Sequence, residues 1–182
     1  MDTTDVWHLI DQARADLTDP RDADDIAARA TSLLAGRPPA DIEAFAQPLW
    51  DLLAHSYRAD LWAAAYTING GASDDGFDYF RGWLIAQGQA TYDQALTDPD
   101  SLADHPAVIQ AAADEMELSG EDILGIAWTA HRQASGKDLP DNAFTITYPD
   151  LDPAWDFDFD NPEEIHRRLP KLAALFLEPD ET

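Results

Sequence analysis

The side chains best suited to chemistry lie close together in one stretch of the sequence. They supply an amide, a hydroxyl, three carboxylates, a guanidinium and an indole, on Asn69, Ser73, Asp74, Asp75, Asp78, Arg81 and Trp83. Carboxylate and amide oxygens are ligands for divalent cations, and the same groups can orient a polar ligand. A metal ion held by the three carboxylates would support hydrolysis. We therefore treat these residues as a candidate ligand-binding site and assign no catalytic residue.

The same residues also have a purely structural interpretation. Ser73 is a good N-cap for a helix, because its hydroxyl can accept a hydrogen bond from a free backbone N–H. Asp74 and Asp75 would then lie in the first helical turn, where the helix dipole favours negative charge. Asp78 and Arg81 are three residues apart and could pair on the helix surface. Both interpretations stay open, but the small and apolar neighbours of Arg81 favour a buried guanidinium that neutralises the carboxylates.

Other patterns stop short of a complete site. Asp156, Asp158 and Asp160 have the spacing of the first ligands in a calcium loop, but Asn161 replaces the required glycine and Arg167 replaces the closing glutamate. A Glu-x-x-His motif occurs once, whereas a di-iron bundle needs two such motifs. The chain has no cysteine, which excludes thiolate catalysis and thiolate metal sites. We expect neither a bound metal ion nor a cofactor.

Helical spacing of apolar residues dominates the sequence and predicts the elements that would position the site. Helices are expected over residues 4–17, 22–35, 40–59, 61–68, 73–88, 90–97, 106–116, 119–136 and 161–176. Pro48 should bend or split the third of these helices. We predict an all-α fold, with about seven to nine helices in one compact domain over residues 1–182. An irregular acidic segment is expected before the C-terminal helix.

In the residues before the C-terminal helix, apolar side chains recur at every second position instead of at helical spacing. Residues 143–148 alternate apolar side chains with threonine, and Trp155, Phe157 and Phe159 alternate with aspartate. Alternation is typical of a strand, but an isolated strand has no partner in this sequence. We therefore expect residues 143–148 to be extended and packed on the helices. The three aromatic residues should also pack on the helical body, because soluble monomers avoid large exposed apolar patches.

The stretch around the candidate site resembles the core of a bacterial family. The resembling segments are residues 61–66 (LWAAAY), 70–77 (GGASDDGF) and 79–85 (YFRGWLI). The family is known as domain of unknown function 4240; its members often come from actinobacteria and are sometimes joined to a WGR domain. The resemblance covers roughly Val6 to Leu102 and implies no activity. We expect residues 1–104 to form the family region and residues 105–182 to form a helical extension packed on it.

Charge narrows the classes of partner. The chain has 36 acidic and 11 basic residues, which give a net charge of −25. Such a field repels nucleic acids and anionic membrane surfaces, so we expect no direct binding to either. A solvated acidic surface that keeps the protein soluble explains the charge, and mimicry of a nucleic acid toward a basic partner is the alternative. The polar N-terminus and the lack of a long apolar run predict a soluble cytoplasmic protein.

These observations favour a function without catalysis. The leading hypothesis is a protein-interaction or ligand-sensing module, with a protein partner or a small polar ligand, in a monomer or a homodimer. The alternative is a metal-assisted hydrolase that uses the carboxylates of Asp74, Asp75 and Asp78.

Overall fold

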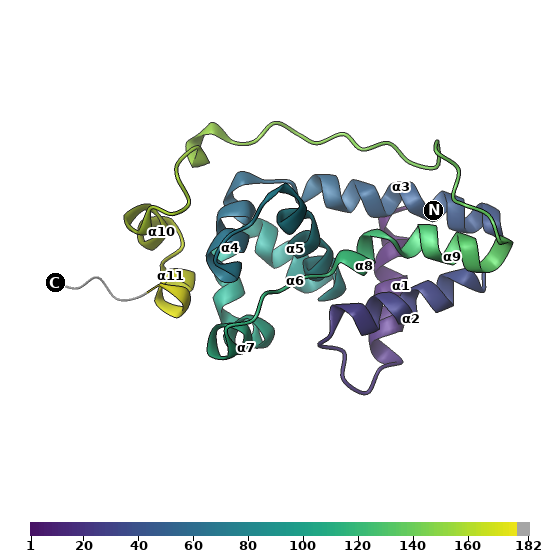
Figure 1. Cartoon of the computed structure of the whole chain (residues 1–182), viewed down its shortest axis with the longest axis horizontal. Helices are drawn as coiled ribbons and strands as arrows, with labels where there is room; N and C mark the ends of the chain where they lie inside the picture. The colour runs from purple at the N-terminus through teal and green to yellow at the C-terminus, as the bar shows by residue number, and fades with distance from the viewer. Residues whose placement is uncertain (178–182) are drawn as a thin grey trace.

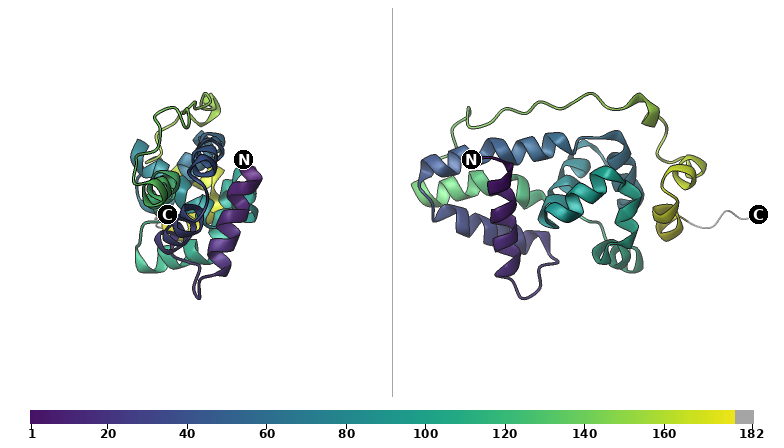
Figure 2. Two further views of the ribbon diagram at one scale, coloured as in Figure 1. Left: turned by 90° about the vertical axis from the view of Figure 1, so that its right-hand side faces the viewer. Right: turned by 180° about the vertical axis from the view of Figure 1, so that it is seen from behind.

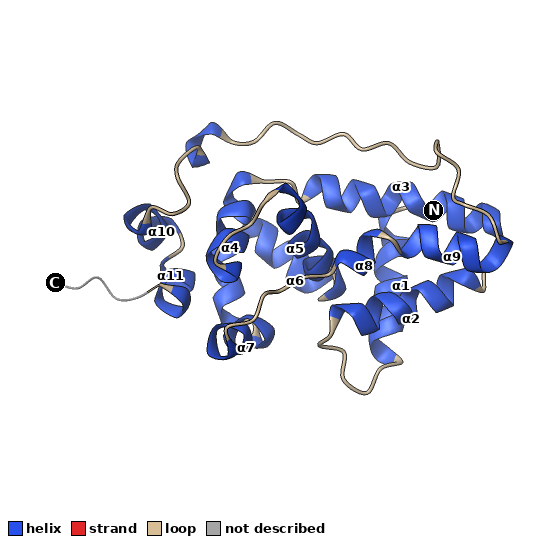
Figure 3. Ribbon diagram, viewed as in Figure 1, coloured by secondary structure: helices blue, strands red, loops and turns tan. Residues whose placement is uncertain are grey.

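The computed structural model describes residues 1–177. Over this range the fold is all-α, as expected, with eleven α-helices, two short 3₁₀ helices and no strand (Figures 1 and 3). In chain order the elements are α1 (Thr3–Ala15), α2 (Ala23–Ala35), α3 (Pro39–His55), α4 (Ala59–Asn69), α5 (Asp74–Ala86), α6 (Gln89–Thr97), η1 (Pro99–Asp104), α7 (Pro106–Asp114), α8 (Glu121–Leu124), α9 (Ile126–Ser135), η2 (Pro153–Trp155), α10 (Pro162–Arg168) and α11 (Pro170–Phe176).

The helices form an elongated body. Helices α1, α2, α3 and α9 occupy one end, α4 to α7 follow, and α10 and α11 lie at the other end (Figure 1). Helix α2 packs against α1 and α9, and α9 also packs against α3. Helix α1 crosses α2 and α3 on the face seen from behind (Figure 2). The core passes through all of these helices and includes the fully buried side chains of Ile10, Ile26, Phe45, Phe80 and Ile126.

Capping residues explain where several helices begin and end. The Asp2 carboxylate accepts a hydrogen bond from the Thr4 N–H at 2.8 Å, and the Asp5 carboxylate accepts one from the Asp2 N–H at 2.8 Å. This reciprocal pair is a capping box, and it starts α1 before the expected residue 4. Gly70 ends α4 with φ of 64°, a left-handed conformation that glycine adopts without strain.

The number of α-helices exceeds the seven to nine that we expected, because two expected helices are each divided. Gly125 separates α8 from α9, and the junction of Leu169 and Pro170 separates α10 from α11. Proline has no N–H to donate, so the helical hydrogen bond to the preceding turn is missing at Pro170. Pro48 was expected to bend or split its helix, and α3 is not split: it runs through this proline.

The segment after α9 runs back along the body as a strap, which we define as residues 140–161. It passes along α3 and reaches α4 (Figures 1 and 2). Phe144 stacks on Trp50 of α3 with ring centroids 5.0 Å apart. The side-chain amide of Gln47 donates to the Thr145 carbonyl at 3.1 Å and accepts from the Thr145 N–H at 2.7 Å. The expectation of an extended segment packed on helices is therefore confirmed for residues 143–148.

The second half of the strap also lies against the body. Trp155, Phe157 and Phe159 are half-buried against the core, whereas the aspartates between them are exposed. Phe159 meets Tyr66 of α4 edge-on, with centroids 5.7 Å apart, and the Tyr66 hydroxyl donates to the Asp160 carboxylate at 2.9 Å. The predicted packing of the three aromatic residues is confirmed.

Helices α10 and α11 follow the strap; α10 packs on α11, and α11 docks on η1 and α4. The buried carboxylate of Asp100 accepts hydrogen bonds from the N–H groups of Lys171 and Leu172, at 3.1 and 2.9 Å. It thereby caps the first turn of α11 from a distant part of the chain. Within residues 1–177, none of the helices is long and apolar enough to cross a membrane.

Candidate functional site

The structure disperses most of the residues of the candidate site. Ser73 is the N-cap of α5, and its hydroxyl accepts from the Gly76 N–H at 3.1 Å. Asp74 and Asp75 are exposed in the first turn of α5, where the dipole favours them. Asn69 exchanges two hydrogen bonds with the backbone of Leu118, at 2.9 and 3.1 Å. The positions of Ser73, Asp74 and Asp75 agree with the interpretation as a helix cap.

Trp83 is part of the core instead of a site. Its side chain is 2% exposed and meets the His105 ring edge-on, with centroids 5.7 Å apart. The Phe80 ring packs beside the Trp83 ring, with centroids 5.3 Å apart. A tryptophan placed in this way contributes burial and shape, and it has little surface left for a ligand.

Arg81 is fully buried, as its neighbours in the sequence predicted. Its guanidinium donates to the Leu53 and Phe77 carbonyl oxygens and pairs with the Asp78 carboxylate. Three aromatic rings surround the guanidinium: its carbon lies 4.7, 5.2 and 5.3 Å from the ring centroids of Phe77, Tyr57 and Tyr148, in that order. Tyr148 belongs to the strap, and it stacks on Tyr57 at 4.3 Å. Arg81 therefore joins the helical body to the strap.

Asp78 is engaged by Arg81, whereas Asp74 and Asp75 are exposed. Burial raises the pKa of the Asp78 carboxyl, and the Arg81 guanidinium offsets this only in part. Within residues 1–177, no group of three or more histidine, aspartate or glutamate side chains is arranged to hold a metal ion. The contacts observed in this region are those of a helix cap at Ser73 and of an ion pair between the buried Arg81 and the half-buried Asp78.

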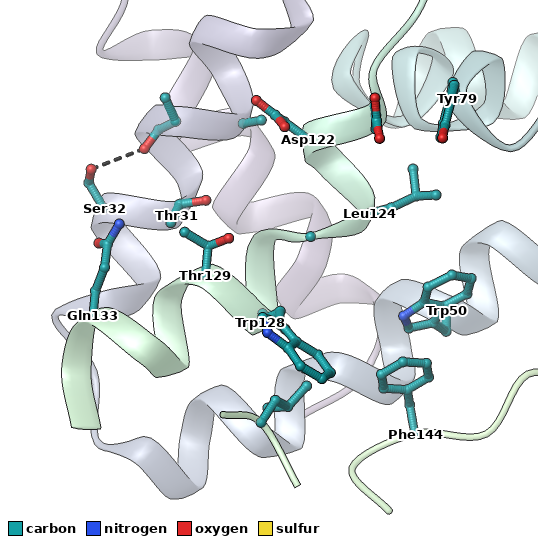
Figure 4. A pocket seen from close by; sticks show the side chains of 16 residues that line it. Thr31, Ser32, Trp50, Tyr79, Asp122, Leu124, Trp128, Thr129, Gln133 and Phe144 are labelled. Atoms are coloured by element: carbon teal, nitrogen blue, oxygen red, sulfur yellow. Dashed lines mark hydrogen bonds between the residues drawn. The ribbon is translucent and has the colours of Figure 1, made fainter. Parts of the chain in front are cut away.

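A hollow that could hold a ligand lies elsewhere, over α8 and α9 (Figure 4). We call it the α8–α9 groove. It has a volume of about 690 Å³, within the range of ligand sites, and α2, α3, α5, α8, α9 and residues 139–144 contribute to it. One part is polar, with Thr31, Ser32, Thr129 and Gln133. The other part is aromatic and apolar, with Trp50, Tyr79, Leu124, Trp128, Leu139 and Phe144.

A close backbone crossing fixes one edge of this groove. The Gly120 N–H donates to the Tyr79 carbonyl at 2.9 Å, where the segment before α8 passes α5. A Cβ atom on Gly82 would collide with the Gly120 carbonyl oxygen, and one on Gly120 would collide with the backbone of Trp83. Glycine is therefore required on both sides of the crossing. The crossing sets the first turn of α8, with Glu121 and Asp122, beside Tyr79.

Carboxylates give this edge a negative potential. The neighbouring Glu121 carboxylate raises the pKa of the Tyr79 hydroxyl, because a second negative charge beside it is unfavourable. Burial, followed by the charge of Asp122, raises the pKa of Asp24 on α2. Among the described residues that line the groove, none is lysine, arginine or histidine. The groove therefore combines an apolar floor with an acidic rim.

Trp128 is the residue of this groove that sequence reasoning should have singled out. Its side chain is 41% exposed, in contrast to the buried Trp83. The inward stripe of its helix contains Ile126, Ala127 and Ala130, so a tryptophan at position 128 must lie on the outer face. A large aromatic side chain on the outer face of an amphipathic helix is a signal for a contact surface.

Comparison of the sequence with known families gives a match over most of the chain. A family model described as "Protein of unknown function (DUF4240)" matches residues 1–133. The chain belongs to this family. The match extends past Leu102, where the resemblance in the sequence ended, and takes in α8 and most of α9. No curated protein and no solved structure matches the sequence.

The family region and the groove coincide in large part. Of the lining residues named above, those on α2, α3, α5, α8 and α9 lie within residues 1–133. Leu139 and Phe144 lie beyond the matched region, and Phe144 completes the aromatic wall by stacking on Trp50, with planes 6° apart. In this member of the DUF4240 family the groove is thus made by the family region and finished by the strap.

Proposed function

We propose that this chain is a non-catalytic interaction module whose α8–α9 groove binds a basic, amphipathic segment of a protein partner. The observation that carries the proposal is the exposed indole of Trp128 in an apolar groove whose rim holds Glu121 and Asp122. Aromatic side chains in such positions dominate binding energies at protein interfaces. The proposal takes up the interaction-module hypothesis and moves its site away from Asp74, Asp75 and Asp78.

Shape and charge support the same class of partner. A helix with a narrow apolar face can bury that face in a groove of this size, as in other helix-in-groove complexes. Lysine or arginine residues beside that face would meet the carboxylates of the rim. The net charge of −25 would accelerate the encounter with a basic partner and reject acidic ones. Both effects weaken as salt screens the charges.

The proposal can be tested with defined peptides. We expect an amphipathic helical peptide of leucine and lysine to bind and to change the emission of Trp128, and a leucine–glutamate peptide of equal length to bind far more weakly. Trp128→Ser should weaken binding by on the order of tenfold, because it removes the central aromatic contact. Asp122→Asn should weaken binding less and should reduce its dependence on salt.

Two controls separate the groove from the general negative charge. Ile109→Ser removes another exposed apolar side chain, on α7, and Asp93→Asn removes an exposed carboxylate on α6. Neither should alter the affinity by more than about twofold, because surface substitutions outside an interface have small effects. If each groove variant behaved like its control, the peptide would be held by net charge alone and the proposal would be wrong.

A further inference from the structure

A second cavity lies between α4 and the strap, away from the α8–α9 groove. We call it the strap cavity. It has a volume of about 510 Å³, and its walls are mostly aromatic: Trp62 and Tyr66 from α4, and Trp155, Phe157 and Phe159 from the strap. Cavities of this size and composition are typical of sites for small molecules. Residues 151–159 lie beyond the family match, which ends at residue 133, so this cavity depends on the part of the chain that the family model does not include.

Hydrogen bonds fix both walls of the strap cavity. The Trp62 indole N–H donates to the Ala72 carbonyl at 3.0 Å, which sets the ring of the α4 wall. The bond from the Tyr66 hydroxyl to the Asp160 carboxylate ties the strap to α4 at one edge of the cavity. The aromatic faces are thus held in place before any ligand enters, which lowers the entropy cost of binding.

The chemistry of the walls selects positive charge. Asp152 and Asp156 contribute carboxylates, and among the described residues that line the cavity none carries a positive charge. Aromatic faces are electron-rich and attract cations, most strongly in the case of tryptophan. An anionic ligand would be repelled by the two carboxylates, and a neutral apolar ligand would gain no attraction from them.

The same aromatic residues already bind a cation within the chain. The guanidinium carbon of Arg168, on α10, lies 4.9 Å from the Trp155 ring centroid and 4.8 Å from that of Phe157. Arg168 is not part of the cavity lining. Its position is an observation independent of the cavity, and it demonstrates that these rings are arranged for cation–π contacts.

We propose that the strap cavity binds a small organic cation, with an alkylated ammonium group enclosed by the aromatic walls and its charge balanced by Asp152 and Asp156. This inference is independent of the proposed function, because it concerns a different cavity and no partner protein. The ligand would contact both α4 and the strap, so binding would hold the strap closed on the body and would slow amide exchange in residues 151–159.

Choline and its neutral isostere 3,3-dimethylbutan-1-ol provide the decisive probe pair, because they have similar shapes and differ in charge. We expect choline to bind saturably in calorimetry on the full chain and to shift the indole N–H resonances of Trp62 and Trp155. The neutral isostere should bind at least about fivefold more weakly, the range expected for a desolvated cation–π contact. Equal affinity for the two probes, or no binding of choline, would overturn the proposal.

Three variants assign the binding to this cavity. Trp155→Leu should abolish choline binding, whereas Trp128→Leu in the α8–α9 groove should leave it unchanged. Because Trp155→Leu could also loosen the strap, Asp156→Asn serves as a second variant that keeps every aromatic wall. It should weaken choline binding by about twofold or more and leave the affinity for the neutral isostere unchanged. Unchanged choline affinity in Asp156→Asn would show that charge is not recognised here and would also overturn the proposal.

Discussion

The helical body and the strap bury their side chains in different ways. In the body, apolar residues recur every three or four positions and reach complete burial, as at Phe45 and Phe80. In the strap, alternate residues such as Trp155 and Phe157 are half-buried, and aspartates between them face solvent. A period of two is typical of a strand, but over residues 1–177 no strand is present. Apolar side chains at every second position therefore indicate an extended segment with one buried face. Helices, and not only a neighbouring strand, can cover that face.

The two regions meet at Arg81. The body supplies its carboxylate and carbonyl partners, and the strap supplies the ring of Tyr148, which is 37% exposed. The body therefore supplies the more buried contacts of Arg81, and the strap supplies a contact through a partly exposed ring. Five predictions test how far this difference in burial is also a difference in energy.

Removal of residues 150–182 should have the largest effect. The deletion uncovers Trp62 and Tyr66 and takes away the buried Leu172 of α11. We expect a loss of on the order of 5 kcal/mol in the free energy of unfolding, or aggregation, measured by thermal denaturation and light scattering.

Two point variants in α11 provide a scale for the loss caused by the deletion. Leu172→Ala should cost about 2–5 kcal/mol, and Leu175→Ala, at a position 39% exposed in the same helix, should cost much less. An unchanged melting temperature after the deletion would mean that this part of the chain is a free arm.

Arg81→Met should destabilise the protein by about 3–5 kcal/mol at neutral pH in denaturant unfolding, because it leaves the half-buried Asp78 carboxylate and the Leu53 carbonyl oxygen without their partner. Arg132→Ala is the control: Arg132 and Asp138 are an exposed pair with side chains 66% and 63% accessible, and the loss there should be about 0–1 kcal/mol. A loss below about 1 kcal/mol for Arg81→Met would show that the buried ion pair contributes no more than a surface pair.

The loss in Arg81→Met should also depend on pH. Burial already raises the pKa of Asp78 in the folded protein, and removal of the guanidinium would raise it further. A raised carboxyl pKa means that the folded state binds a proton more readily than the unfolded state, so the penalty grows as pH rises through that pKa. The difference between wild type and Arg81→Met should therefore be smaller near pH 4 than at neutral pH. A difference that is constant with pH would exclude Asp78 as its source.

Gly82→Ala should have an intermediate effect. The new methyl group would collide with the Gly120 carbonyl oxygen, and backbone cannot move aside as a flexible side chain can. We expect a loss of about 1–3 kcal/mol by denaturant unfolding, together with weaker binding at the α8–α9 groove, since the crossing positions Glu121. Gly36→Ala is the control, because the nearest atom to its new methyl group lies at an ordinary 3.5 Å. If both variants were equally stable, the crossing would not be close-packed in solution.

Gln47→Ala should have the smallest effect and would probe the strap alone. It removes both hydrogen bonds that the Gln47 amide makes to Thr145. Thr145 is exposed and Gln47 is only half-buried, so global stability should fall by no more than about 1 kcal/mol. Hydrogen exchange of the Thr145 amide should nevertheless become much faster, because its acceptor is lost. Unchanged exchange would place the anchor of this half of the strap in the stacking of Phe144 on Trp50.

The sequence was sufficient for the features that depend on local periodicity. Helix positions, the cap at Ser73, the buried Arg81 and the extended residues 143–148 all follow from neighbours within a few positions. Features that depend on distant contacts were missed. Gly120 is the N-cap of α8, and this residue passes closely over Gly82. No local pattern relates two glycines so far apart.

The arrangement of the candidate-site residues also depends on distant contacts. Asn69 and Asp78 are near each other in the sequence, but Asn69 bonds to Leu118 and Asp78 to Arg81, so proximity in sequence did not become a shared pocket. The α8–α9 groove draws its lining from α2, α3, α5, α8 and α9, and only their packing brings these together. Trp128 was the exception, because the outer face of its helix could be identified from the sequence.

The cap that Asp100 provides to α11 affects how well a separate peptide can compete with the strap for its binding surface. The strap is tethered at both ends, by α9 before it and by α11, which Asp100 holds on the body. A strap that detaches between these anchors therefore remains at an effective concentration on the order of millimolar next to its own binding surface. A separate peptide of the same sequence, added at micromolar concentration, would be outcompeted by the covalent copy. Loss of the anchor at Asp100 would lower this local concentration and make the surface available to such a peptide.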